Sequence, residues 1–446
     1  MKRILITDIG TLAGIQPEDK HCLCGKEMAH VETLRDAWLL IEDGIIKDFG
    51  GSTSRPSLGE EMEIISANVG TVLPCFCDSH THLVYANSRE QEFVDKIQGL
   101  SYAEIARRGG GILNSADRLH ELSEDELYHQ SMQRVNEIIR KGTGAVEIKS
   151  GYGLNTADEL KMLRVIRRIK ETSPITVRST FLGAHAVGRA YIGRQKEYVD
   201  LVIQEMIPEV GRQGLADFID VFCDEGFFTP EETARILEAG AKWGMRPKIH
   251  GQELADSGGV EVAVRHNALS IDHLESMTDR DIELLLTEQE LRSAGAQECR
   301  CVDNSEDSSR SLPWGESGWG RLVPTALPGT SFFLNMPFAP GRKIIEAGLP
   351  LAIASDYNPG STPSGDMKFV ISLACIKMRL LPEEALNAAT LNTAAAMGIA
   401  HSHGSITRGK VANIIITDPI PSLPYIPYAY TQPIIRRVFL NGEEVR

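Results

Sequence analysis

The chain has 446 residues, of which 42% are hydrophobic and 24% are charged, and this composition is typical of a globular protein. Its formal net charge of −15 argues against nucleic acid or an anionic membrane as a partner, because phosphate groups bind basic surfaces. No stretch approaches the roughly 18 apolar residues of a membrane span, and eight cysteines do not make a disulfide framework in a chain this long. We therefore expect a cytoplasmic protein whose partner is a small molecule.

Both ends of the chain carry short strand-like segments. Near the N-terminus the stretch EDGIIKDFG predicts a turn between two strands, and KVANIIITD and IIRRVFLNGEEVR repeat this style near the C-terminus. The simplest interpretation is one small, β-sandwich-like domain assembled from residues 1–68 together with residues 404–446.

Residues 69–403 alternate strand-like runs with helix-patterned segments. The eight runs lie at residues 69–80, 144–153, 175–185, 218–226, 246–253, 268–276, 321–329 and 350–360. Near-continuous apolar runs are expected of parallel strands that are buried on both faces. Eight βα units predict an α/β fold, a (β/α)₈ TIM-like barrel, whose active site lies at the C-terminal ends of the strands.

The first run continues as VLPCFCDSHTHLVYANSRE, residues 72–90, and places two histidines one residue apart. In a strand, residues i and i+2 point to the same side, so His80 and His82 would face the same way. Packing a core does not require such a pair. The pattern indicates a site at the end of the first strand.

Other strand runs also end in polar residues. The third ends in His185, the fifth in His250 followed by Glu253, the sixth in His273, and the eighth in Asp356 followed by Asn358. Imidazole and carboxylate groups without neighbouring cysteines suit Zn²⁺, or Fe and Mn. His80, His82, His250 and Asp356 supply four ligands. Water bound to such a metal ionises near pH ~7 and becomes a nucleophile.

The segment at residues 287–321 interrupts the alternation of strands and helices. It is polar, rich in serine and glycine, and has no apolar periodicity. A loop of this length is either functional or disordered. Because it precedes a strand, it falls on the N-terminal face of the barrel, and we expect residues 290–320 to form a flexible insertion away from the active site.

The motif DSHTH at the end of the first strand, the histidines on strands five and six, and the aspartate on strand eight resemble the amidohydrolase superfamily. The strand-like segments at both termini fit its companion β-domain. Members with two metals bridge them through a carboxylated lysine on strand four, but here that strand reads VFCDEGFF and Lys149 lies on strand two. The resemblance therefore implies one Zn²⁺ or Fe per chain.

Six segments narrow the resemblance to one family of this superfamily: SHTHLVYANSRE, EIKSGYGL, TFLGAHAV, IHGQELADSGG, IDHLE and ASDYNPGSTPSG. Members of that family hydrolyse 4-imidazolone-5-propionate to N-formimidoyl-L-glutamate in histidine degradation. The resemblance implies metal binding by the four ligands named above. It implies substrate contacts from Arg89, Tyr152, His185, Glu253, Asn358, Gly360 and Ser361.

The residues suit this ring opening. Asp356 or His273 could take up the proton of the attacking water, and His185 and His273 could stabilise the developing oxyanion. Glu253 could orient the ring or return a proton to the leaving nitrogen. Arg89 can bind the propionate carboxylate bidentately.

Two other interpretations remain open. Another mononuclear amidohydrolase, such as a deaminase of a cyclic amidine, would share the metal site but would not need Arg89 or Tyr152. A non-catalytic scaffold on the same fold would be expected to lack some of the ligands. A homodimer is the expected assembly.

Overall fold

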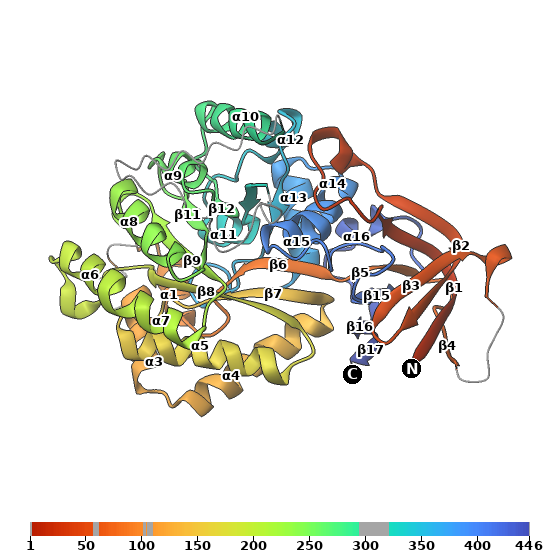
Figure 1. Ribbon diagram of the computed structural model, residues 1–446, viewed down its shortest axis with the longest axis horizontal. Coiled ribbons are helices and arrows are strands. Elements are labelled where there is room, and N and C mark those ends of the chain that lie inside the picture. Colours follow the sequence, from red (N-terminus) through yellow and green to blue (C-terminus); the bar gives the residue numbers. More distant parts are fainter. Residues whose placement is uncertain (1, 57–61, 101–103, 105–109, 294–320, 446) are drawn as a thin grey trace.

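The computed structural model describes residues 2–56, 62–100, 104, 110–293 and 321–445. Two sheets organise the chain, a parallel barrel and a separate sheet built from both termini (Figure 1). The largest cluster of buried apolar side chains surrounds the barrel strands and extends to Leu73, Ile415 and Val438 of the terminal sheet, and a second cluster lies within the terminal sheet. Within the described ranges, no helix combines the length and the apolar character needed to cross a membrane.

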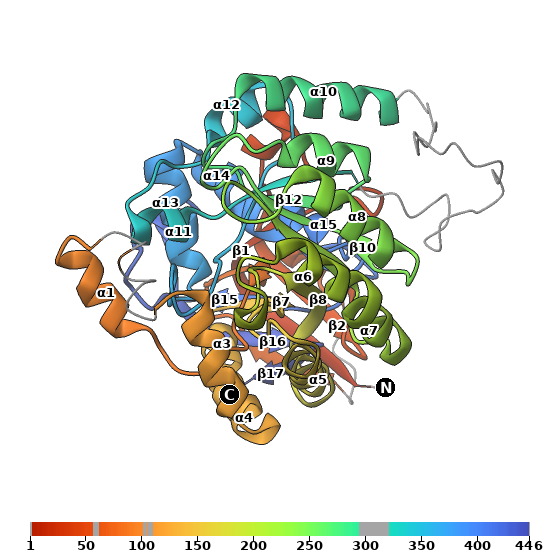
Figure 2. The ribbon, with the colours of Figure 1, turned by 90° about the vertical axis from the view of Figure 1, so that its left-hand side faces the viewer.

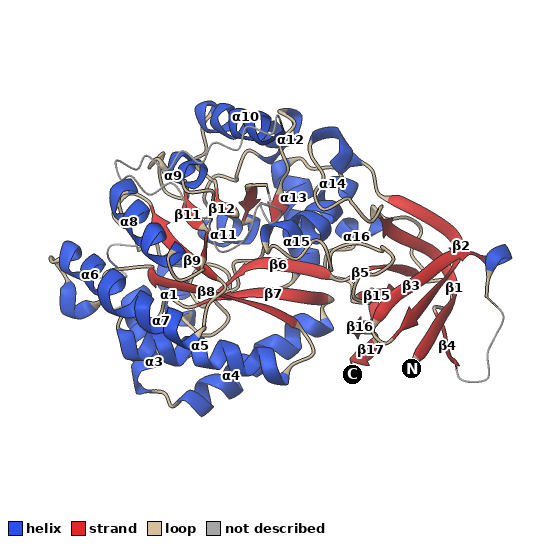
Figure 3. Cartoon of the chain, viewed as in Figure 1, coloured by secondary structure: helices blue, strands red, loops and turns tan. Residues whose placement is uncertain are grey.

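The barrel strands follow one another in chain order, and all their pairings are parallel, as the sequence predicted. The strands are β6 (Phe76–Thr81), β7 (Thr143–Lys149), β8 (Thr176–Ala184), β9 (Phe218–Cys223), β10 (Arg246–Pro247), β11 (Ile249–Gly251), β12 (Ser270–His273), β13 (Val323–Ala326) and β14 (Ala352–Ile353). The predicted fifth strand is β10 and β11 with Lys248 between them. Figure 3 shows these strands enclosed by helices.

The backbone beyond β14 closes the barrel against β6. Thr81 and Tyr357 form a parallel bridge. The amide of Asp356 donates to the carbonyl of His80 at 3.0 Å, and the amide of His82 donates to the carbonyl of Tyr357 at 2.9 Å. These bonds place Asp356 directly beside the two histidines of the first strand.

Helices cover the outside of the barrel (Figure 2). They are α1 (Glu90–Ile97), α3 (Ile112–Glu121), α4 (Glu124–Arg140), α5 (Thr156–Thr172), α6 (Gln195–Leu201), α7 (Ile207–Gln213), α8 (Pro230–Ala241), α9 (Gly259–Arg265), α10 (Asp279–Ser293), α11 (Pro328–Leu334), α12 (Gly341–Glu346), α13 (Met367–Met378), α14 (Pro382–Asn387), α15 (Thr393–Ala396) and α16 (Tyr425–Tyr428). Local sequence fixes several of their starts. The Ser123 hydroxyl accepts from the amide of Glu126, whose carboxylate accepts from the amide of Ser123, so α4 begins with a capping box.

The terminal sheet has the order β17-β16-β15-β5-β1-β2-β3, with β4 beside β1. Its strands are β1 (Arg3–Ile15), β2 (Glu32–Glu42), β3 (Ile45–Gly51), β4 (Met62–Ser66), β5 (Thr71–Pro74), β15 (Ile414–Thr417), β16 (Ile435–Leu440) and β17 (Glu443–Val445). The run expected to be the first barrel strand is divided at Cys75, because β5 pairs with β1 and β15 whereas β6 pairs with β7. The separate sheet from both ends agrees with the sequence analysis.

The expected insertion at residues 290–320 begins within a helix, since α10 extends to Ser293. Residues 294–320 lie outside the described residues. Its flexibility stays a prediction.

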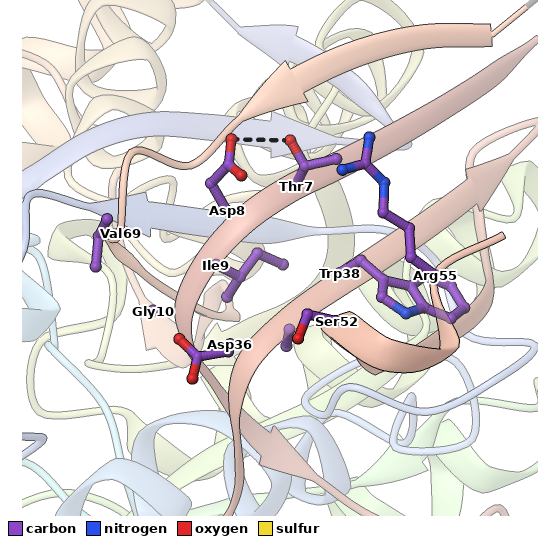
Figure 4. Close-up of a pocket in the computed structure, with 10 residues that line it drawn as sticks. Thr7, Asp8, Ile9, Gly10, Asp36, Trp38, Ser52, Arg55 and Val69 are labelled. Atoms are coloured by element: carbon purple, nitrogen blue, oxygen red, sulfur yellow. Dashed lines mark hydrogen bonds between the residues drawn. The ribbon is translucent and has the colours of Figure 1, made fainter. Parts of the chain in front are cut away.

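A cavity of about 380 Å³ lies on the terminal sheet (Figure 4). Its polar lining includes the carboxylates of Asp8 and Asp36, and Thr7 donates a hydrogen bond of 3.1 Å to Asp8. Both aspartates are exposed, and both have a positive φ. None of the residues that we expected in the active site lines this cavity.

The fully buried side chain of Asn392 connects the barrel to the loop that precedes the 3₁₀ helix η1 (Gly25–Ala29). Its amide accepts from the N–H of Leu23 at 2.9 Å and donates to the carbonyls of Leu23 and Leu351 at 2.9 and 3.0 Å. Asn392→Ala leaves these three backbone groups without partners and should lower the free energy of unfolding by about 3 kcal/mol. Chemical denaturation of the variant measures this loss. The exposed Gln98→Ala is the control, and equal stabilities of the two variants would contradict the assignment.

Candidate active site

Three histidines converge at the C-terminal end of the barrel. His80 lies on β6, His82 follows that strand directly, and His250 lies on β11. All three side chains are buried, with at most 2% of their surface exposed. One ring nitrogen from each lies within 4.8 Å of the others, and the Nε2 atoms of His82 and His250 are 3.3 Å apart. The alternation of the first strand therefore does place the two imidazoles in one site.

Asp356 joins this cluster through the barrel closure. Its Oδ1 lies 3.6 Å from Nε2 of His80 and 3.7 Å from Nε2 of His82. Ligand atoms of a tetrahedral zinc site with bonds of about 2.1 Å are separated by about 3.4 Å. The distances from Oδ1 of Asp356 to the two histidines are close to this spacing.

The three imidazoles are held in their neutral form. Burial lowers the pKa of His80, His82 and His250 well below the usual value, and neighbouring positive groups lower each of them further. Nε2 of His80 is buried and has no hydrogen-bond partner in the described structure. A neutral imidazole with a free ring nitrogen is a metal ligand, so the three histidines could hold a metal ion.

Two buried aspartates stand behind the histidines, and the sequence analysis did not identify them. Oδ2 of Asp272 is 2.7 Å from Nδ1 of His80, and Oδ2 of Asp220 is 2.9 Å from Nδ1 of His250. The hydrogen bond to Asp272 fixes the proton at Nδ1 of His80 and leaves Nε2 available to a metal. Asp220 contacts Nδ1 of His250 at ion-pair distance, without the geometry of a hydrogen bond. The only signal in the sequence is a charged residue inside an apolar strand run, in FIDVFC and in SIDH.

His273 lies between two acidic side chains. Its Nε2 is 3.6 Å from Glu253 and its Nδ1 is 3.6 Å from Glu275. Burial alone would lower the pKa of His273, but Glu253 and Glu275 raise it to about 10. Burial raises the pKa of Glu253 to about 7. The site thus pairs a positively charged imidazolium with a carboxyl group that can exchange a proton near neutral pH.

His185 faces the cluster from the end of β8. Its ring stacks on that of His82, with ring centroids 5.0 Å apart. The ring centroid of Tyr152 lies 5.4 Å from that of His185. Burial lowers the pKa of His185 to about 4, and its Nδ1 donates to the carbonyl of Gly151 at 3.0 Å. The other nitrogen of this neutral ring is therefore a hydrogen-bond acceptor. Stabilising an oxyanion needs a hydrogen-bond donor, and a neutral His185 with this tautomer does not offer one to the site, whereas a protonated His273 would.

The residues after β14 hold Asp356 in place. Oδ1 of Asn358 accepts from the amides of Gly360 and Ser361 at 2.7 and 2.8 Å. The Ser361 hydroxyl donates to Oδ2 of Asp356 at 3.1 Å, and Thr330, which the sequence analysis did not identify, donates to the same oxygen at 2.6 Å. These contacts occupy Oδ2 and leave Oδ1 toward the histidines.

Arg89 lies against the same loop. A Cβ on Gly360 would come within 2.3 Å of Nη1 of Arg89, so the guanidinium packs directly against this glycine. Nε and Nη2 of Arg89 bind the carboxylate of Glu92 at 2.9 and 2.5 Å. Lys96 donates to the carbonyl of Gly360 at 3.0 Å, which adds a second cation beside the loop. Glu92 and Lys96 both lie on α1, and neither was identified from the sequence.

With this geometry, the fold and the sequence agree on a family. The model of the amidohydrolase family matches residues 71–445, and the chain belongs to that family. Within it, the chain is a member of the imidazolonepropionase group. The imidazolonepropionase of Christiangramia forsetii is 48% identical over 99% of each chain, and that of Flavobacterium johnsoniae is 48% identical over 98% of this chain and 99% of the relative. That of Brevibacillus brevis is 38% identical over 99% of this chain and 97% of the relative.

Solved structures show the same fold at low identity. E. coli guanine deaminase superposes with a TM-score of 0.71 and 11% identity, over 100% of this chain and 99% of that one. A triazine hydrolase variant superposes with a TM-score of 0.71 and 16% identity, over 100% and 94% of the two chains. These similarities concern the fold.

Removing one histidine of the cluster should remove the metal. His250→Ala deletes a donor that lies 3.3 Å from Nε2 of His82, and the variant should lose most of its bound divalent metal. Elemental analysis of wild type and variant after the same loading measures this. The exposed His129→Ala should keep the wild-type content. Unchanged metal in His250→Ala would contradict the cluster as the binding site.

Proposed function

We propose that this chain is a metal-dependent hydrolase that opens the ring of 4-imidazolone-5-propionate to give N-formimidoyl-L-glutamate in histidine degradation. The observation that carries the proposal is the cluster of His80, His82 and His250, with Oδ1 of Asp356 at 3.6 and 3.7 Å from Nε2 of the first two. Beside it, His273 lies 3.6 Å from Glu253. The imidazolonepropionase names of relatives that match nearly the whole chain support the same reaction.

The four converging side chains would hold one Zn²⁺ or Fe ion. When bound, the metal lowers the pKa of a water molecule so that it can attack the ring carbonyl carbon. Residues of β9 support a single ion, because that strand carries no lysine that could bridge a second. Asp356 would bind through Oδ1, since Thr330 and Ser361 hold Oδ2.

The remaining residues act on the substrate. The imidazolium of His273 donates to the carbonyl oxygen, where negative charge develops as water adds. Glu253, with its pKa of about 7, takes the proton of the water and returns it to the ring nitrogen as the carbon–nitrogen bond breaks. The neutral His185 accepts from an N–H of the ring. Arg89, Asn358 and the backbone at Gly360 and Ser361 form the rim that receives the propionate.

The other interpretations have less support. A deaminase of a cyclic amidine would use the same metal site, but it would not need cations such as Arg89 and Lys96 at the rim. A non-catalytic scaffold does not require the strained, preorganised site found here, in which His273 and Asp356 have φ values of 91° and 54°. A homodimer and a cytoplasmic location stay predictions.

The direct test is incubation of metal-loaded protein with 4-imidazolone-5-propionate. Loss of the ultraviolet absorbance of the ring, together with appearance of N-formimidoyl-L-glutamate, would support the proposal. Protein treated with a chelator should be inactive and should recover when metal is added. Loaded protein that leaves the substrate unchanged would overturn the proposal.

The single site also predicts the metal stoichiometry. Four donors suit one tetrahedral ion, so fully loaded wild-type protein should contain about one equivalent per chain. Elemental analysis against a protein concentration from amino-acid analysis measures the ratio. A reproducible ratio of two would contradict the mononuclear site.

Arg89 is proposed to bind the propionate carboxylate. A charge-assisted contact of this kind contributes about 1.5–3 kcal/mol, so Arg89→Ala should lower kcat/KM by about 10- to 150-fold while it keeps its metal. Arg89→Lys should recover only part of the loss, because an ammonium lacks the planar fork of a guanidinium.

A substrate analogue whose propionate is an uncharged amide is the control for this assignment. Wild type should lose activity on the amide, whereas the alanine variant should lose little more than it has lost already. An equal penalty from the mutation on both substrates would place the carboxylate elsewhere.

A further inference from the structure

The interior of the barrel beneath the histidines holds five charged side chains instead of the branched apolar residues that usually fill such barrels. All five are at most 1% exposed. They are Glu147 and Lys149 on β7, Asp220 on β9, Lys248 between β10 and β11, and Asp272 on β12. We call them the buried charge cluster.

Lys149 is the centre of the buried charge cluster. Its ammonium is 2.8 Å from Glu147, 2.7 Å from Oδ2 of Asp220 and 3.5 Å from Oδ2 of Asp272. One cation therefore touches three carboxylates that come from three strands. Lys248 is placed differently, because it binds Glu147 and the carbonyl of Ser79 and only approaches Asp272 to 4.0 Å.

The oxygens that contact Lys149 are the same ones that contact the histidines. Oδ2 of Asp272 lies 2.7 Å from Nδ1 of His80, and Oδ2 of Asp220 lies 2.9 Å from Nδ1 of His250. A single carboxylate oxygen therefore lies between the ammonium of Lys149 and each of these two imidazoles. The two chains of contacts leave Lys149 in different directions and end at the same metal-binding cluster.

We propose that Lys149 is a positioning residue for the metal centre, which holds the carboxylates of Asp220 and Asp272 in place and so directs Nε2 of His80 and His250 to the same point. The inference rests on the proposed metal site. Three carboxylates this close would repel one another without the cation, and at least one would rotate away. A rotated carboxylate no longer contacts Nδ1 of its histidine, and outer contacts of this kind change metal affinity by about 10- to 100-fold.

Stability alone gives a poorer account of the same residues. Buried ion pairs are often no more stabilising than apolar side chains of similar volume, so a barrel core does not need them. If these ion pairs served stability alone, they could lie at any level of the barrel interior, with no need to be next to the histidines. Here Asp272 hydrogen-bonds to Nδ1 of His80, and Asp220 lies 2.9 Å from Nδ1 of His250, in each case on the side of the ring opposite the nitrogen that faces the proposed metal.

The experiment measures metal affinity and stability separately in Lys149→Met. Competition of Zn²⁺ between protein and a chromophoric chelator gives the affinity, and thermal unfolding of the metal-free proteins gives the stability. Lys149→Met should bind Zn²⁺ about 10- to 100-fold more weakly than wild type. Lys410→Met is the matched control, because Lys410 is a lysine of 2% exposure that bonds to Ser405 and the carbonyl of His403, away from the cluster.

The control should lose stability but keep its Zn²⁺ affinity within about twofold. Wild-type affinity in Lys149→Met, with stability reduced as in Lys410→Met, would overturn the inference and leave the lysine a structural role. Wild-type protein that binds no Zn²⁺ would instead overturn the proposed function.

A second variant covers the case in which Lys149→Met does not fold. Glu147→Gln combined with Lys149→Met removes one charge of each sign, so the net charge of the barrel interior is unchanged. Because Asp220 and Asp272 still lack their shared cation, the double variant should also bind Zn²⁺ about 10- to 100-fold more weakly. Recovery of wild-type affinity would overturn the inference, because net charge would then matter and the position of Lys149 would not. In Co²⁺-loaded protein, the visible spectrum of the double variant should differ from wild type, and an identical spectrum would equally contradict the inference.

Discussion

The barrel must keep three neutral imidazoles and several ionised side chains out of water in one interior, and the rest of the structure depends on how it does so. An unpaired charge buried in this way costs several kcal/mol, so each one needs a partner of opposite sign or a hydrogen bond. Asp220 and Asp272 each have both a lysine and a histidine as partners. Because burial favours the uncharged imidazole, the same desolvation that makes the interior costly also prepares His80, His82 and His250 as ligands.

The backbone at the mouth of the barrel is held in conformations that L-residues rarely adopt. His273, Leu274 and Asp356 have φ values of 91°, 74° and 54°, and each such residue costs about 1–3 kcal/mol. These unfavourable backbone conformations persist because contacts with the surrounding residues stabilise them. Asp356, for example, is fixed by its amide bond to His80 and by the hydroxyls of Thr330 and Ser361. The site is therefore rigid where the chemistry needs fixed donors.

The sequence predicted the eight barrel strands and the polar residues at their ends, because polar side chains stand out where an apolar run stops. It did not predict Asp220, Asp272 or the central place of Lys149. These residues lie inside strands, where a single charged residue resembles ordinary alternation, and their partners are up to 192 positions away in the chain. Glu92 and Lys96 were missed for a similar reason, since charged residues on a short helix usually face solvent. The division of the first run at Cys75 could not be read from composition, because both halves are equally apolar.

The division of the first strand run at Cys75 limits how the barrel and the terminal sheet can be recombined with other domains. Only Cys75 separates β5 of the terminal sheet from β6, and its amide donates to the carbonyl of Asn413 at 2.9 Å. Asn413 also donates to the carbonyl of Gly144 within β7, so the base of the barrel and the C-terminal part of the sheet share one hydrogen-bonded junction. The strand that carries His80 thus follows directly on a strand of the terminal sheet. Such a barrel cannot be separated from its accessory sheet at a flexible linker, and any recombination that gave it a new accessory domain would have to rebuild the strand that precedes His80 and His82.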